Sequence, residues 1–253
     1  MAKRPVLRRK TNKMPWHVAF QTVKPYVVKI ITPQASGTGF LVACTGNQEF
    51  LGIATAAHVI DFPHYWEQPI RIQHFQSGKT VFLNNPDRFI DINYARDTAC
   101  IVICGGELPF PKDALPIIPE GNCLKVGVEV GWIGFPAIAP TNLCFFSGNT
   151  SSWVESEGFY FVDGVAINGV SGGPTFSISR ENSVQIIGFV SAYVPNRATG
   201  AQLPGLCVVR DVLPLYKTIK GLKNLEEAKK KEKTSAEPPP PPTAPSFGEQ
   251  TRS

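Results

Sequence analysis

Short runs of β-branched and aromatic residues recur along the chain, and they restrict its fold class more than any other feature. They include YVVKIIT, GTGFLVAC, TACIVIC, GFYFVD and VQIIGFVSAYV. Runs of this kind are typical of β-strands, and the 22 glycines and 23 prolines supply residues for the turns between them. Many short strands separated by turns predict an all-β sandwich or barrel.

The proline-rich stretch GGELPFPKDALPIIPEG, residues 105–121, separates two strand-rich halves of similar size. Proline and glycine interrupt regular strands, so this stretch reads as a bridge. We therefore expect one β-barrel over residues 16–112 and a second over residues 113–216.

The two ends differ from this body. Residues 1–15 form a basic N-terminal arm, and residues 217–253 form a charged helix followed by a proline-rich tail. PLYKTIKGLKNLEEAKKKEK is the one stretch that predicts a helix, and we expect it to be short. The tail TSAEPPPPPTAPSFGEQTRS is of low complexity, and such tails are typically disordered, with polyproline II where prolines run. It is either a spacer or a ligand for a proline-motif-binding partner.

Charge is unevenly distributed along the chain. Residues 1–29 hold eight Lys or Arg and no acid, whereas residues 30–216 hold nine bases against fifteen acids. A nucleic-acid-binding core would be basic, so we expect no specific nucleic-acid binding. Three interpretations of the arm stay open: a solvated segment, a contact to phosphates or lipid headgroups, and a nuclear address.

Location and redox state follow from what the sequence lacks. No apolar run approaches the roughly 18 residues of a membrane span, and the N-terminus lacks the apolar stretch of a secretory signal. We expect an intracellular protein, with an organelle, the nucleus or a virus-infected cell all open, and no membrane span. Several of the six cysteines lie within apolar runs such as TACIVIC, and buried, reduced thiols are expected; the six are Cys44, Cys100, Cys104, Cys123, Cys144 and Cys207. Without CxxC or HxxxH, we expect neither a metal site nor a cofactor.

One of the four histidines stands out. His58 ends the apolar run LGIATAAHVI, which reads as a strand that carries the imidazole past two alanines. His17 falls in the basic arm, and His64 and His74 fall in a polar stretch where exposed histidines are unremarkable. By itself, a histidine at a strand end also reads as structural. Together with the glycine run at residues 168–174, His58 is the candidate catalytic base.

A base of this kind needs an orienting carboxylate. Asp97 lies directly before the apolar run TACIVIC, where an unpaired charge would be costly to bury and so requires a partner. Asp91 is the competing candidate, but no buried strand follows it directly. We favour Asp97.

The run NGVSGGP, residues 168–174, surrounds a single hydroxyl with glycines. The N–H groups of Gly169 and Ser171 can point into one space and stabilise an oxyanion. Glycine at 169 permits unusual backbone angles, and Gly172 and Gly173 permit a sharp turn and close packing. By itself the run also reads as a plain glycine-rich turn.

Taken in the order TAAH, RDTA and NGVSGGP, the sequence resembles the trypsin-like serine peptidases of the chymotrypsin fold, over roughly residues 25–212. SGTGF, VGVEVGWIGFP and IIGFVSAYV fit the same family, and the motifs are most similar to the Deg type and its trypsin-like relatives. The resemblance implies two packed six-stranded antiparallel β-barrels, with His58 and Asp97 from the first and Ser171 from the second. It also implies that Ser191 donates a hydrogen bond toward Asp97 and that its strand pairs with the substrate.

Departures from the family pattern narrow the expectation. Val59 replaces the cysteine that follows the histidine in digestive members, and Val170 replaces the aspartate that binds their new N-terminus after zymogen cleavage. The residues after the second barrel are too few for the PDZ domain of Deg peptidases. By the same resemblance, Val165, Ala192 and Tyr193 line the first specificity pocket, which implies an uncharged P1 residue.

Three functions follow from these patterns. The first is a serine endopeptidase that acts on a polypeptide substrate through His58, Asp97 and Ser171. The alternative is a catalytically silent trypsin-fold binding module that acts through the cleft or the proline-rich tail. A transferase or an esterase with the same nucleophile is the third.

Overall fold

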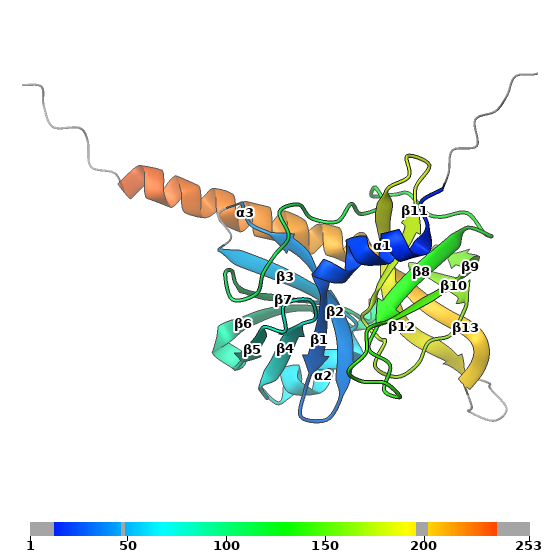
Figure 1. Cartoon of the computed structure of the whole chain (residues 1–253). Helices are drawn as coiled ribbons and strands as arrows, with labels where there is room; N and C mark the ends of the chain where they lie inside the picture. The colour runs from blue at the N-terminus through cyan, green and yellow to red at the C-terminus, as the bar shows by residue number, and fades with distance from the viewer. Residues whose placement is uncertain (1–12, 47–48, 196–201, 237–253) are drawn as a thin grey trace, which may run out of the picture.

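The computed structural model describes residues 13–46, 49–195 and 202–236, with side chains given except at 193–195, 202–204 and 233–236 (Figure 1). The first twelve residues of the basic arm and the proline-rich tail from residue 237 lie outside the described residues, so the predictions made for them stay predictions.

Seven strands of the N-terminal half form one antiparallel sheet in the order β5-β4-β1-β2-β3-β7-β6. They are β1 (Val27–Ile31), β2 (Ser36–Cys44), β3 (Phe50–Thr55), β4 (Ile70–His74), β5 (Thr80–Leu83), β6 (Arg88–Asn93) and β7 (Thr98–Cys104). The alternating pattern of a sheet with one buried face is clear in β4, where Ile70 and Ile72 are buried and Arg71 and Gln73 are exposed. β3 is instead buried over nearly its whole length, because both of its faces are covered.

Six strands of the C-terminal half close into an antiparallel barrel in the order β10-β13-β12-β11-β8-β9. They are β8 (Glu129–Gly134), β9 (Cys144–Val154), β10 (Phe159–Asp163), β11 (Pro174–Ile178), β12 (Val184–Pro195) and β13 (Gln202–Asp211). Trp132, Phe176 and Phe189 are fully buried. The all-β, chymotrypsin-like class is confirmed.

The first half differs in detail from a closed six-stranded barrel. Its edge strands β5 and β6 are not paired with each other in the described sheet. A 3-10 turn, η2 (Asn85–Asp87), joins them, and the guanidinium of Arg88 donates to the carbonyls of Leu83 at 2.7 Å and Pro63 at 3.0 Å. A side chain thus holds the two edges together where a backbone ladder would close a barrel.

The described chain contains three α-helices: α1 (Trp16–Val23), α2 (Ala57–Tyr65) and α3 (Leu213–Ala236). The prediction of a C-terminal helix is correct, but at 24 residues α3 is not short. No residue pattern predicted α1 and α2, whose eight and nine residues are too few to show a helical period. His17, expected in the basic arm, accordingly lies in α1.

The two terminal helices each pack on the opposite half of the molecule (Figure 1). From α1, the ring of Trp16 lies 5.5 Å from Phe145 and 5.9 Å from Phe176, both in the barrel. From α3, Leu222 is buried and approaches Gly52 of β3 in the first sheet. These crossed contacts hold the sheet and the barrel against one another.

Two further expectations concern the cysteines and membrane spans. All six cysteines are free of disulfide bonds, but only Cys100 and Cys207 are buried, while Cys104 and Cys123 are exposed. Within the described ranges, no helix has the length and apolar character needed to cross a membrane.

Candidate active site

His58 lies in the first turn of a helix, not at the end of a strand as the sequence predicted. The run LGIATAAHVI is divided: β3 ends at Thr55, Ala56 is extended with φ −76° and ψ 144°, and α2 begins at Ala57. The change of direction at Ala56 leaves the side chain of His58 50% exposed beside the end of a buried strand. The prediction was wrong because the apolar run continues without a break from β3 through Ala56 into the first turn of α2, so its residues resemble one strand.

Asp97 caps this helix from a distant part of the chain. Its backbone carbonyl accepts from the N–H of Ala57 at 3.2 Å, and its Oδ1 accepts from the N–H of His58 at 3.0 Å. Ala56, the residue before the helix, offers no side-chain cap. Because a helix N-terminus has unpaired N–H groups and a partial positive charge, a carboxylate is favoured there.

The same carboxylate holds the imidazole. His58 Nδ1 lies 2.9 Å from Asp97 Oδ2 and 3.1 Å from Oδ1. Ser191 Oγ donates to Asp97 Oδ2 at 2.5 Å. Burial raises the pKa of Asp97, but the hydrogen bonds from His58 and Ser191 outweigh it and hold the pKa below its ordinary value. Asp97 is therefore a charged acceptor that fixes the proton of the imidazole on Nδ1.

Backbone geometry contributes to this placement. Asp97 follows the 3-10 turn η3 (Tyr94–Arg96) and has φ 47° and ψ 45°, in the left-handed region. Asp tolerates that region better than most residues with a Cβ. The competing candidate, Asp91, lies on β6 and accepts a hydrogen bond from Thr218 Oγ1 of α3 at 3.3 Å. It therefore binds the C-terminal helix and not His58.

The glycine-rich loop meets the end of β3. Gly172 has φ 82°, and a Cβ there would lie 2.1 Å from the carbonyl oxygen of Thr38 and 2.2 Å from Thr55 Oγ1. Neither contact leaves room for a side chain. The loop that carries Ser171 is thus seated against the strand that leads into His58.

The N–H groups of this loop alternate between bonded and free. Those of Val170, Gly172 and Gly173 donate to the carbonyls of Ile167, Val190 and Val170 at 2.7–3.0 Å. Those of Gly169 and Ser171 have no acceptor among the described residues. The loop therefore retains two N–H groups that donate no hydrogen bond, one on each side of Val170.

Ser191 connects the serine to the His58–Asp97 pair. Ser171 Oγ donates to the carbonyl of Ser191 at 3.5 Å, and Ser191 Oγ donates to Asp97. Within the described part of the chain, no hydrogen bond joins Ser171 Oγ to the imidazole of His58. The structure thus brings four of the candidate residues together, from α2, the turn before β7, the loop before β11, and β12.

Of the three residues predicted to line the specificity pocket, the structure describes the side chains of two. Val165 lies in the loop after β10 and is 48% exposed, and Ala192 is exposed on β12. The backbone of Tyr193 pairs with Cys207, but its side chain lies outside the described residues. Next to Val165, Gly164 packs on Trp132, where a Cβ would be 2.2 Å from the ring.

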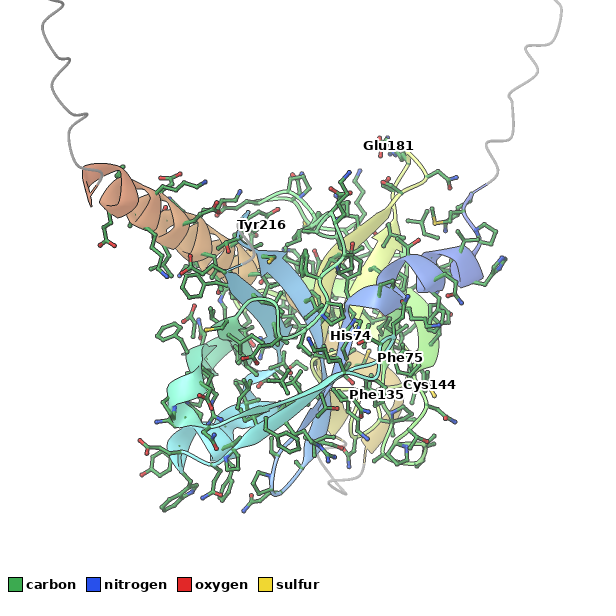
Figure 2. All side chains as sticks on the ribbon, turned by 60° about the vertical axis from the view of Figure 1, so that its left-hand side comes forward. His74, Phe75, Phe135, Cys144, Glu181 and Tyr216 are labelled. Atoms are coloured by element: carbon green, nitrogen blue, oxygen red, sulfur yellow. The ribbon has the colours of Figure 1, made fainter. Side chains whose placement is uncertain are left out.

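The remaining histidines have other surroundings. His74, expected to be exposed, is only 3% exposed, because its ring bonds Ser77 Oγ at 2.8 Å and the carbonyl of Pro25 at 2.7 Å. Figure 2 shows it near the contact between Phe75 and Phe135, whose rings lie 5.7 Å apart across the junction of the two halves. Its role is structural. In the described ranges, no three His, Cys, Asp or Glu side chains form a group that could hold a metal.

In sequence, the chain matches no family model and no curated protein. In structure, it is similar to a serine endoprotease from Yersinia pestis, with a TM-score of 0.61 and 18% identity over 83% of this chain and 66% of that one. It is also similar to the Rv3671c protease in an inactive form, with a TM-score of 0.58, 18% identity, and coverage of 83% and 96%. An inactive serine-to-alanine mutant of Rv3671c from Mycobacterium tuberculosis H37Rv gives 0.56 and 17%, with coverage of 84% and 95%. The chain has the fold of these serine proteases.

Proposed function

We propose that this chain is a serine endopeptidase with Ser171 as its nucleophile. Ser171 Oγ attacks the carbonyl carbon of a peptide bond while its proton passes to His58 Nε2. The imidazolium then gives that proton to the departing amine, and a water molecule activated in the same way releases the acyl group. Asp97 keeps Nδ1 protonated throughout, which leaves Nε2 free to accept.

One observation carries this proposal. The Asp97 carboxylate is bonded at once to the backbone and imidazole of His58 and to Ser191, whose carbonyl accepts the hydroxyl of Ser171. A half-buried carboxylate with this many donors is fixed in position, and it fixes the ring it touches. To reach the imidazole, Ser171 Oγ has to turn from Ser191 about its own Cα–Cβ bond; such hydrogen bonds are often long before substrate binds.

The free N–H groups of Gly169 and Ser171 support a further part of the proposed mechanism, the stabilisation of the oxyanion that forms when Ser171 attacks. The negative charge of a tetrahedral intermediate needs donors that are already in place, since donors that must first break other bonds contribute less. We assign these two groups to that oxyanion. Gly169, at φ 92°, adopts a backbone conformation that residues with a Cβ rarely adopt.

For specificity, we propose that Val165, Ala192 and Tyr193 receive an uncharged P1 side chain. Val165 and Ala192 present apolar surface, and neither would pair with a Lys or Arg side chain. Cleavage of a peptide library tests this: we expect cleavage after small or medium-sized apolar residues, and a preference for basic residues would contradict the assignment.

A turnover assay tests the function itself. The purified full chain should hydrolyse a library peptide, and Ser171→Ala should lower turnover by several orders of magnitude. The matched control is Ser147→Ala, because Ser147 is an exposed serine on β9 away from the site. Normal turnover by Ser171→Ala would refute the proposal.

The second candidate is a catalytically silent binding module of the same fold, in which Ser171 Oγ stays bonded to the carbonyl of Ser191 and does not turn toward His58. That protein would bind peptides in the cleft without cleaving them, and Ser171→Ala would leave the affinity unchanged. An esterase or transferase would instead turn over activated esters and leave peptides intact.

A further inference from the structure

We propose that Thr38 is a positioning residue that holds the oxyanion-binding loop in place, an inference that rests on the proposed function. Thr38 lies on β2 in the N-terminal half and is fully buried. Three of its four hydrogen bonds, however, go to the C-terminal half of the molecule. It therefore joins the half that supplies His58 to the half that supplies Ser171.

The hydroxyl of Thr38 has two partners. It donates to the carbonyl of Gly169 at 2.8 Å and accepts from the N–H of Phe135 at 3.0 Å. The backbone N–H of Thr38 donates to the carbonyl of Ser171 at 2.9 Å. One residue thus binds the carbonyls of both residues whose N–H groups we assign to the oxyanion.

The backbone of Thr38 also reaches the strand before His58. Its carbonyl accepts from Thr55 Oγ1 at 2.8 Å, and Thr55 is the last residue of β3. The loop of Ser171 and the strand that leads into α2 therefore share a single anchor.

The hydrogen bond from Phe135 to Thr38 also helps to orient the N–H of Gly169, through the segment that follows Phe135. Two residues after Phe135, the N–H of Ala137 donates to the carbonyl of Asn168 at 2.7 Å. In a trans peptide the C=O and N–H groups point in opposite directions, and the described chain has no cis peptide. Holding the carbonyl of Asn168 toward Ala137 therefore directs the N–H of Gly169 away from it, where it stays free for an oxyanion.

Close packing leaves the hydroxyl little freedom to find other partners. A Cβ at Gly134 would lie 2.8 Å from Thr38 Oγ1 and 2.9 Å from Val170 Cγ1. Valine fills the same volume as threonine but can neither donate nor accept. Thr38→Val should thus leave the carbonyl of Gly169 and the N–H of Phe135 unpaired in a buried place, and the loop should move to relieve this.

The test compares three variants of the full chain. Thr38→Val removes the hydroxyl, Thr38→Ser retains it, and Thr150→Val is the matched control. Thr150 is also buried, and its hydroxyl likewise donates to a carbonyl, that of Lys125 at 2.6 Å, and accepts an N–H, that of Val128 at 3.1 Å. Its partners lie outside the candidate site, so Thr150→Val reports the cost of losing such a hydroxyl without moving the loop.

We expect Thr38→Val to lower kcat about tenfold or more, with KM changed less than about twofold, because only the transition state carries the oxyanion. Binding of a peptidyl trifluoromethyl ketone, whose adduct with the serine bears that oxyanion, should weaken by a similar factor, while affinity for a product peptide should not change. Thr38→Ser should restore both values, and Thr150→Val should lower the melting temperature but not kcat. If Thr38→Val does not fold, Thr38→Ala gives the same comparison.

Two outcomes would overturn the inference, and they differ. A reactive wild-type chain whose Thr38→Val variant matches Thr150→Val in kcat and ketone affinity refutes the role of Thr38 and leaves the proposed function intact. A wild-type chain that neither cleaves peptides nor binds the ketone refutes the proposed function and this inference with it.

Discussion

Gly172→Ala should destabilise the junction of the two halves by far more than the backbone angle of Gly172 requires. At φ 82°, any residue with a Cβ pays roughly 1–2 kcal/mol for the left-handed conformation. In addition, the new methyl group would lie 2.1 Å from the backbone oxygen of Thr38 and 2.2 Å from Thr55 Oγ1. Both atoms belong to buried strands, so about 1 Å of backbone movement is needed, and overpacking of this kind costs roughly 1–3 kcal/mol or more.

The matched control is Gly127→Ala. Gly127 also has φ 82°, but a Cβ there would have no atom within 4 Å. Urea unfolding of both variants, followed by tryptophan fluorescence, should give a loss of about 1–2 kcal/mol for Gly127→Ala and about 2–5 kcal/mol for Gly172→Ala. Equal losses in the two variants would show that the loop of Ser171 is not packed against β3 as described.

Three further predictions concern Asp97 and the C-terminal helix. Asp97→Asn should lower peptide turnover by about 10³–10⁴, whereas Asp91→Asn should leave it within about twofold in the same assay; the reverse result would exchange their roles. Because hydrogen bonds hold the folded-state pKa of Asp97 below its ordinary value of 3.8, the stability they supply is present above that pH and is lost as the pH falls below it. Urea midpoints measured from pH 6 to pH 2.5 should therefore fall more steeply for the wild type than for Asp97→Asn, and parallel curves would contradict the assigned hydrogen bonds. Leu222→Ala should cost about 2–5 kcal/mol, since Leu222 is buried between α3 and the first sheet, and Leu225→Ala less than about 0.5 kcal/mol, since Leu225 is 50% exposed; equal losses would mean that α3 does not pack on the first sheet.

Residue patterns predicted the class of the fold and the residues that meet at the candidate site. His58 and Asp97 stood out because each adjoins an apolar run, and the structure places Nδ1 of the first within 2.9 Å of the second. The glycines around Ser171 stood out because glycine runs admit a backbone that other residues do not, and Gly169 and Gly172 both have positive φ.

Local patterns failed where distant parts of the chain decide the structure. Nothing near Ala57 signals a helix start, because its cap, Asp97, lies forty residues further along the chain. The burial of His74 depends on Pro25, in a segment forty-nine residues away. Thr38 was missed for the same reason: SGTGF reads as an ordinary strand, and its partners Gly169 and Phe135 lie in the other half.

The central claim, that His58 activates Ser171 as a nucleophile, is tested most directly by locating a covalent adduct. The full chain would be treated with a fluorophosphonate and digested, and the modified residue identified by mass spectrometry, with His58→Ala treated in parallel. We predict one phosphonylated residue, Ser171, formed at least about a hundredfold more slowly in His58→Ala. An unmodified Ser171, or one modified equally fast without His58, would contradict the account.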